Sequence, residues 1–497
     1  MVDANKTAQW IKSRIKREQV DKYLGNGVDF IDDKGFESKL SRNRNPDRKR
    51  IKDIFAKSLN IETLTLDEVA SLINLRDPEL LAEMKEVASK IKKKVYDNRI
   101  VTFAPLYLCN LCVNDCLYCG FRSSNKKVLR KVLDMAEVRK ETEVLAGEIG
   151  HKRLIVVYGE DPSTDVNYMV DTIREIYKVK VKTKNGFGQI RRVNINAPAL
   201  SIEELKQLKE IGIGTYQVFQ ETYHHETYSR FHPAGTIKGD YRWRLSCMHR
   251  AQEAGVDDVG IGALFGLYDW RFEVMGLLAH SRELEAKFGI GPHTISFPRI
   301  EIAPNVPFTQ NPGYKVSDED FKKLICILRL AVPYTGMIIS ARETAQIRRE
   351  ALSLGITQTD ASSKIGIGAY SDSGNDQEGN RQQFLLGDTR SLDEVIGEFA
   401  SMGYITSFCT AGYRCGRTGK RIMDLLKSGA EGKFCKLNAV LTFREWIDDF
   451  ASDETKLKAE KIIEKEIAEI KVVLPEFFSQ FMGYYQRIKE GERDLYF

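Results

Sequence analysis

The sequence lacks the features that mark membrane, exported and nucleic-acid-binding proteins. No run of apolar residues approaches the roughly 20 that a membrane-spanning helix needs, although hydrophobic residues make up 42% of the 497. The first residues, MVDANKTAQWIKSR, have no apolar signal-peptide core, so we expect a cytoplasmic protein with no membrane partner. The 75 basic residues nearly balance the 70 acidic ones, which argues against a nucleic-acid partner.

Cysteine is scarce and unevenly distributed, with nine in the chain. A disulfide framework is not expected in a reducing compartment, where clustered thiols indicate metal or cluster ligands. Two groups stand out, which are Cys109, Cys112, Cys116 and Cys119 in the first half and Cys409, Cys415 and Cys435 near the end. We interpret Cys247 and Cys326, which fall in amphipathic helical stretches, as packing residues, and Cys109 likewise.

The pattern of apolar residues divides the chain into three regions. Residues 1–98 are charged and carry apolar residues at helical spacing, and residues 403–497 hold the second cysteine group and a charged helical tail. Between them, residues 99–402 alternate short β-rich runs with amphipathic helices, which predicts an α/β fold with a (β/α)8 barrel of the TIM type. A doubly wound open sheet is the alternative. The eight predicted strands are 99–108, 153–159, 191–197, 215–221, 258–266, 293–302, 336–343 and 357–368.

The first cysteine group contains the spacing C-x3-C-x2-C at Cys112, Cys116 and Cys119. It follows the first barrel strand, so it lies at the carboxyl end of the barrel, where enzymes of this fold carry out their chemistry. Three thiolates can hold three irons of a cubane cluster and leave the fourth iron open to a small ligand. A structural zinc site, with Cys109 as its fourth ligand, is the alternative.

The spacing, with Tyr118 between the last two cysteines, resembles the signature of the radical S-adenosylmethionine (SAM) superfamily. In that superfamily the open iron binds SAM, and reductive cleavage of SAM yields a 5′-deoxyadenosyl radical. Gly159 and Glu160 end the second predicted strand at the same face. By this resemblance, such a glycine–glutamate turn contacts the SAM amine.

Longer segments resemble one family within the superfamily, the radical SAM tyrosine lyases that mature iron–iron hydrogenase (HydG-type). The resemblance extends from about residue 60 to 450. It implies that the radical abstracts hydrogen from the amine of L-tyrosine, and that Cα–Cβ cleavage gives p-cresol and dehydroglycine. It further implies that dehydroglycine becomes carbon monoxide and cyanide on a second cluster. The segments are LYLCNLCVNDCLYCGFRSSN, VNINAPAL, GTYQVFQETYHHETYSRFHPAG, DDVGIGALFGLYDWRFEV, GPHTISFPRIE, AVPYTGMIISARE and CTAGYRCGRTG.

A tyrosine substrate needs a cation for its carboxylate. Arg342 and Ser340 end the seventh predicted strand on the catalytic face, and an arginine there can form a forked pair with a carboxylate. A barrel-rim salt bridge is the alternative role for Arg342. Gln220 and Glu221, which end the fourth predicted strand, are further polar candidates for the pocket that holds SAM and substrate.

The second cysteine group departs from the family pattern. HydG-type proteins carry C-x2-C-x22-C, whereas here Gly412 takes the middle position and Cys415 follows three residues later. If this segment is helical, Cys415 lies on roughly the same face as position 412 and can replace the missing ligand. If it is a tight loop, the thiol moves by several ångströms. Cluster ligation, zinc and no metal are therefore all open for Cys409, Cys415 and Cys435.

His293 opens the sixth predicted strand, directly after a Gly-Pro pair, so it lies at the amino end of the barrel. By the resemblance, the matching histidine binds an extra iron beside the second cluster. A hydrogen-bonded structural histidine is the alternative.

The function expected from this resemblance is that of a tyrosine lyase supplying diatomic ligands for a hydrogenase. Its expected partners are L-tyrosine, a reductant such as ferredoxin or flavodoxin, and hydrogenase maturation scaffold proteins. One alternative is a tyrosine lyase that releases dehydroglycine, also called 2-iminoacetate, as in the thiamine pathway. Another is a non-catalytic iron–sulfur carrier, which would need neither a SAM site nor a substrate pocket.

Overall fold

Eight parallel strands close into a barrel. The computed structural model describes residues 4–372, 380–428 and 431–497. Strand order around the sheet is β10-β9-β8-β7-β6-β5-β2-β1, and the pairing of β10 with β1 closes the ring. This closure confirms the predicted barrel and excludes the doubly wound sheet. The barrel strands are β1 (Arg99–Cys109), β2 (Arg153–Tyr158), β5 (Arg192–Asn196), β6 (Tyr216–Gln217), β7 (Val259–Gly262), β8 (Thr294–Ser296), β9 (Gly336–Ile339) and β10 (Gln358–Asp360).

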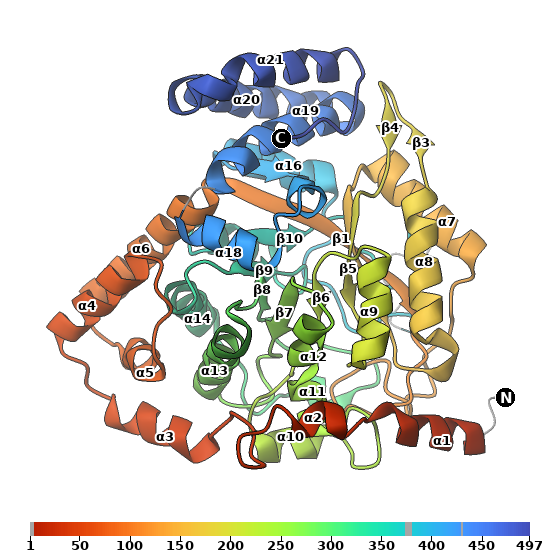
Figure 1. Cartoon of the computed structure of the whole chain (residues 1–497), viewed down its shortest axis with the longest axis vertical. Helices are drawn as coiled ribbons and strands as arrows, with labels where there is room; N and C mark the ends of the chain where they lie inside the picture. The colour runs from red at the N-terminus through yellow and green to blue at the C-terminus, as the bar shows by residue number, and fades with distance from the viewer. Residues whose placement is uncertain (1–3, 373–379, 429–430) are drawn as a thin grey trace.

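Helices surround this barrel (Figure 1). The helices α7, α9 and α16 begin at capping boxes, in which Asp134, Ser201 and Ser391 each pair with a glutamate three residues on. A small hairpin, β3 (Val181–Lys182) with β4 (Phe187–Gly188), projects between α8 and β5. The surrounding helices are α7 (Met135–Glu143), α8 (Val166–Lys178), α9 (Ile202–Glu210), α10 (His225–Phe231), α11 (Tyr241–Leu245), α12 (Cys247–Glu253), α13 (Trp270–Phe288), α14 (Asp318–Ala331), α15 (Ala345–Leu352) and α16 (Leu392–Ser401).

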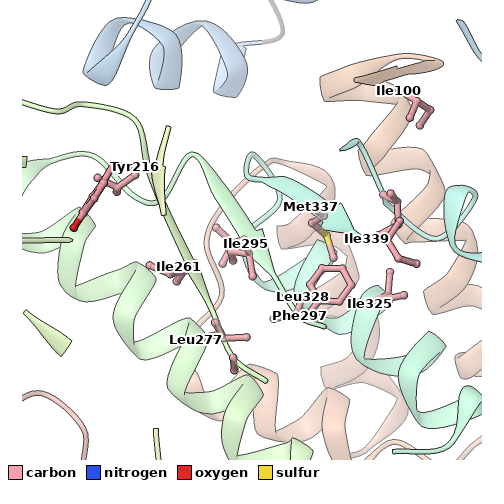
Figure 2. Close-up of a cluster of buried hydrophobic side chains, with 14 of the residues drawn as sticks. Ile100, Tyr216, Ile261, Leu277, Ile295, Phe297, Ile325, Leu328, Met337 and Ile339 are labelled. Carbon is pink, nitrogen blue, oxygen red and sulfur yellow. The ribbon is translucent and has the colours of Figure 1, made fainter. Parts of the chain in front are cut away.

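The core between the strands and the outer helices is apolar. Figure 2 shows Ile261, Ile295 and Met337 of three successive strands next to Leu277 of α13 and side chains of α14. All of them are fully buried or nearly so. Burial of each such side chain stabilises the fold by roughly 1.5–3 kcal/mol, which holds the strands at fixed positions around the barrel.

Six helices precede the barrel, as the sequence predicts for residues 1–98. In Figure 1 the first three lie along one end of the molecule beside α10 and α11, and the other three pack on its side. No described helix is long and apolar enough to cross a membrane. The six are α1 (Ala4–Arg14), α2 (Glu18–Asp21), α3 (Asp33–Arg42), α4 (Arg48–Leu59), α5 (Leu66–Asn74) and α6 (Pro78–Tyr96).

The segment after the barrel returns to the amino ends of the strands. A short strand that the sequence did not predict, β11 (Ile405–Ser407), pairs in parallel with the first three residues of β1. In Figure 1 the last helices gather at the end opposite α1 to α3. The elements after β11 are α17 (Ala411–Arg414), α18 (Gly419–Ser428), α19 (Glu431–Phe450), α20 (Asp453–Val473) and α21 (Pro475–Lys489).

Several predicted strands are longer than those observed. The eighth, expected over 357–368, is Gln358–Asp360, and the fourth, expected over 215–221, is only Tyr216–Gln217. After these few paired residues the chain leaves the sheet to form loops around the carboxyl ends of the strands. A β-rich composition alone does not distinguish paired residues from such loops. Below, the carboxyl ends of the strands are called the upper mouth and the amino ends the lower mouth.

Candidate active site and second metal centre

A cavity of about 240 Å³ lies at the upper mouth. Cys112, Cys116 and Cys119 all line it, on the loop that follows β1. Deeper in the barrel, the strands contribute an apolar cluster to its wall, formed by Phe103, Ile155 and Ile338. The three predicted cluster ligands and a space large enough for small molecules therefore share one enclosure.

Main-chain hydrogen bonds fix the cysteine loop to its surroundings. The amide of Val113 donates to the Glu160 carbonyl at 2.8 Å, and that of Leu117 donates to the Phe231 carbonyl at 3.1 Å. At Gly159 the chain after β2 passes very close to the cysteine loop, because a Cβ there would lie 2.0 Å from the Leu111 carbonyl oxygen. A side chain at position 159 would therefore displace the loop that carries the cysteines.

Glu160 presents one unsatisfied oxygen in this enclosure. Its Oε2 accepts a hydrogen bond of 2.6 Å from Asn114 Nδ2. Its Oε1 is buried with no hydrogen-bond partner among the described residues. Burial raises the pKa of this carboxyl. A buried acceptor of this kind fits an ammonium or hydroxyl donor supplied by a ligand.

Glu221 forms an ion pair with Lys238 at 2.7 Å and lies 3.4 Å from Arg244. Burial alone would raise the pKa of Glu221, but the two cations hold it below its ordinary value. All three side chains line the cavity, so this wall carries fixed charges of both signs.

Arg342 and Ser340 line the same cavity. The Arg342 guanidinium carbon lies 3.3 Å from the centre of the Phe384 ring, and burial lowers the pKa of Arg342. In the described part of the chain no hydrogen bond or ion pair engages this side chain. The Ser340 hydroxyl is likewise buried without a partner among the described residues.

Gln220 is placed differently from the prediction. Gln217, Phe219 and Glu221 line the cavity and Gln220 does not, because side chains alternate across an extended chain. Both polar atoms of its side chain are buried without a partner among the described residues.

The second cysteine group lies at the lower mouth, as expected if the chain turns under the barrel. Arg153, the first residue of β2, donates to the Cys409 carbonyl at 2.7 Å. Arg99, the first residue of β1, lies beside Cys435. The Tyr413 ring lies below the strands, with the Arg192 guanidinium carbon 4.3 Å from its centre. Cys409 and Cys435 thus lie close to arginines at the amino ends of the strands.

His293 belongs to the same mouth, directly before β8. Its Nδ1 lies 3.7 Å from Asp258 Oδ1, and each of these atoms is buried without a hydrogen-bond partner among the described residues. A carboxylate facing one imidazole nitrogen is the usual arrangement behind a metal-binding histidine, since it sets which nitrogen carries the proton.

Cys415 follows the one-turn helix α17. Its amide donates to the Ala411 carbonyl at 2.9 Å, so Cys415 caps the end of this turn, and its Sγ lies 3.9 Å from the Phe497 carbonyl oxygen. Among the described residues, no three His, Cys, Asp or Glu side chains converge on a single ion position. A cubane needs no such convergence, because each of its cysteines binds a different iron.

Comparisons with known proteins agree with this geometry. The radical SAM superfamily model matches residues 106–275, and the model of the biotin and thiamin synthesis associated domain matches residues 296–405. A solved HydG, a maturase of FeFe-hydrogenase, is 46% identical with a TM-score of 0.89, covering 95% of this chain and 100% of that one. The chain belongs to the HydG-type radical SAM enzymes.

Further relatives of this HydG-type enzyme are more distant. The HydG of Carboxydothermus hydrogenoformans is 36% identical with a TM-score of 0.76, covering 96% of this chain and 99% of that one. The 2-iminoacetate synthase of Escherichia coli is 30% identical over 354 residues, which are 70% of this chain and 87% of the relative. The resemblance, the barrel fold and the enzyme class expected from the sequence are therefore confirmed. This family uses a 4Fe–4S cluster and SAM.

Sequence reasoning missed several residues of this HydG-type enzyme's two mouths. Lys238 and Arg244 line the upper cavity, Asn114 donates to Glu160 in its wall, and Asp258 faces His293. Asn114 lies inside the cysteine motif and could have been noticed there. The others are ordinary charged residues in loops or helices, and no sequence signal separates them from solvent-exposed ones.

Proposed function

We propose that this chain cleaves the Cα–Cβ bond of L-tyrosine to give p-cresol and dehydroglycine. We propose further that it converts dehydroglycine to carbon monoxide and cyanide at a second iron–sulfur site, for assembly of an iron–iron hydrogenase active site. The observation that carries the first step is Arg342, a partly buried cation with no ion-pair partner among the described residues, in the cavity that the three cysteines line. A cation partly withdrawn from water is stabilised by a ligand that supplies the opposite charge.

The residues present fit the family's cofactors. Cys112, Cys116 and Cys119 would hold the 4Fe–4S cluster, and the unpartnered oxygen of Glu160 would accept a hydrogen bond from the SAM amine. A ferredoxin or flavodoxin would supply one electron, with which the bound cofactors provide a carbon-centred radical that can abstract hydrogen. It would supply a second electron, taken up with a proton, to convert the aryl fragment of the substrate to p-cresol.

The chain's own side chains would then bind and orient the substrate. Arg342 would hold the tyrosine carboxylate in a forked pair, and the Ser340 hydroxyl would hydrogen-bond the same end of the molecule. The apolar side chains of Phe103, Ile155 and Ile338 line part of the cavity and would help to exclude water from a reactive intermediate. The enclosure also argues against a carrier protein, which needs no substrate cavity.

The second step would take place at the lower mouth. Cys409, Cys415 and Cys435 would hold the second cluster, and His293, faced by Asp258, would bind an additional iron. The nearby cations Arg99, Arg153 and Arg192 would offset the negative charge of thiolates and sulfides. Hydrogenase maturation scaffold proteins are the proposed recipients of the product.

A second candidate stops at dehydroglycine. The departure at Gly412 and the similarity to 2-iminoacetate synthase favour it. Both candidates produce p-cresol, but only the first produces carbon monoxide.

The deciding measurement is the ratio of carbon monoxide to p-cresol from anaerobically reconstituted protein with SAM, tyrosine and dithionite. We expect comparable amounts of the two. p-Cresol without carbon monoxide would support the tyrosine lyase step and overturn the proposed second step. Absence of both, with SAM uncleaved, would return the protein to the carrier class.

A further inference from the structure

The segment 493–497 returns to the lower mouth after α21 and is called the clasp below. Asp494 anchors it to the segment that carries the displaced cysteine. Its Oδ1 and Oδ2 accept hydrogen bonds of 2.7 and 2.8 Å from the two terminal nitrogens of Arg414, the residue before Cys415. A forked pair of this kind fixes the direction of both side chains.

Asp494 also joins this segment to the barrel and to α19. Its Oδ1 lies 3.0 Å from Arg191 Nε, just before β5, and its amide donates to Glu445 Oε1 at 2.7 Å. Glu445 is fully buried and pairs with Arg191 at 2.7 Å and Lys152 at 3.0 Å. Asp494, whose side chain is 41% exposed, therefore joins the end of the chain to the buried charge network of Glu445, Arg191 and Lys152.

The other end of the clasp contacts Cys415 itself. The Phe497 carbonyl oxygen accepts from Arg417 Nη2 at 3.1 Å and from Asn438 Nδ2 at 3.2 Å, and the Cys415 sulfur lies 3.9 Å from it. The Phe497 amide donates to Asn438 Oδ1 at 2.8 Å. Asn438 lies on α19, three residues after Cys435. The clasp thus links α19, which carries Cys435, to the segment that carries Cys415.

The vacated position 412 is close to the same contacts. A Cβ on Gly412 would lie 3.4 Å from the Arg417 carbonyl oxygen, its nearest neighbour among the described residues, so a cysteine would fit there. The same Arg417 donates to Phe497, beside Cys415. A one-turn helix has little stability of its own, so the position of a thiol at its end depends on outside contacts.

We propose that the clasp, through Asp494, is the positioning element that lets Cys415 serve as the cluster ligand missing at position 412. This inference rests on the proposed second cluster. Here the family's local ligand is replaced by a cysteine whose place is set by residues some eighty positions further along the chain.

The first test is Asp494→Ala in the full chain, reconstituted anaerobically. We expect a loss of about four irons per chain and of the electron paramagnetic resonance signal of the second cluster. The upper-cluster signal and SAM cleavage should be unchanged, which reports that the barrel is folded. The matched control is Glu492→Ala, which removes a carboxylate of the same tail that pairs with Arg487 where both side chains are about half exposed.

The decisive variant adds Gly412→Cys to Asp494→Ala. Restoring the family spacing supplies a ligand that does not need the clasp, so iron content and the second signal should return. A full iron count in Asp494→Ala would overturn the proposal, as would a double variant that stays poor in iron. Wild-type protein without a second cluster would instead overturn the second step of the proposed function, and this inference with it.

Discussion

The two mouths of the barrel hold their cysteines by different means. At the upper mouth three cysteines lie within one short loop, and hydrogen bonds such as Val113 to Glu160 fix that loop to the next strand. At the lower mouth Cys409 and Cys435 come from separate elements and meet arginines that begin barrel strands. Because the three upper cysteines share one short loop, the number of residues between them is constrained. The lower arrangement is assembled by tertiary contacts, which leaves room for a ligand to move from position 412 to 415.

Two buried glutamates show the same contrast in charge. Glu273, on α13 behind the upper mouth, accepts from the Tyr223 amide at 2.8 Å and forms no ion pair with any described residue, and burial raises its pKa to about 8. At the lower mouth burial would also raise the pKa of Glu445, but Arg191 and Lys152 lower it to about 2. The surroundings of Glu273 thus favour a neutral acid, whereas those of Glu445 hold a charged network.

The largest effect is expected from Arg342→Lys at the upper mouth. A lysine cannot form the forked pair, so kcat/KM for tyrosine should fall about 100-fold, on the order of 3 kcal/mol, with both products reduced together. SAM cleavage without tyrosine should persist. Arg349→Lys, at an exposed ion pair with Glu398, is the control. A change in carbon monoxide alone would show that Arg342 does not hold the substrate.

A smaller and more selective effect is expected from His293→Ala at the lower mouth. Carbon monoxide output should fall about 10-fold or more, because the proposed iron ligand is lost, while p-cresol stays within about twofold. Asp258→Asn should reduce carbon monoxide less, since it removes only the carboxylate that faces the ring. The ligand role would be falsified if His293→Ala left carbon monoxide output unchanged.

The smallest effect concerns stability and pH. The pKa of Glu273 in the fold lies above its unfolded value of 4.5, so its stabilising contribution is complete below that value and is lost as pH rises toward 8. Glu273→Gln should therefore be more stable than wild type at pH 8 by about 1 to 3 kcal/mol, with little difference at pH 5.

Melting temperatures of the two proteins across this pH range provide the measurement. Glu445→Gln should show the opposite pH dependence. Because the pKa of Glu445 is lowered to about 2 in the fold, this carboxylate stabilises the protein above pH 4.5, and that stabilisation is lost on acidification. The variant should be less stable than wild type at pH 7. Parallel melting curves for Glu273→Gln and wild type would contradict the contrast between the two mouths.

The sequence by itself determined the barrel and the upper site. Alternating strands and helices, capping boxes such as that of Ser201, and the spacing of Cys112, Cys116 and Cys119 are local patterns, and local patterns are readable without a structure. The predictions that were wrong also concerned local features. Strand lengths were overestimated, and Gln220 was placed in a cavity that its neighbours line, because alternation along an extended chain is lost when the exact register is unknown.

Only the tertiary structure decided the lower mouth. The sequence left open whether Cys415 follows a helix or a loop, and it gave no signal for β11, for Asp258 facing His293, or for Asp494 reaching Arg414. These contacts join residues far apart in the chain, and each partner is an ordinary polar residue. Their effect depends on burial and mutual distance, which arise only when the barrel closes and the final segment folds back beneath it.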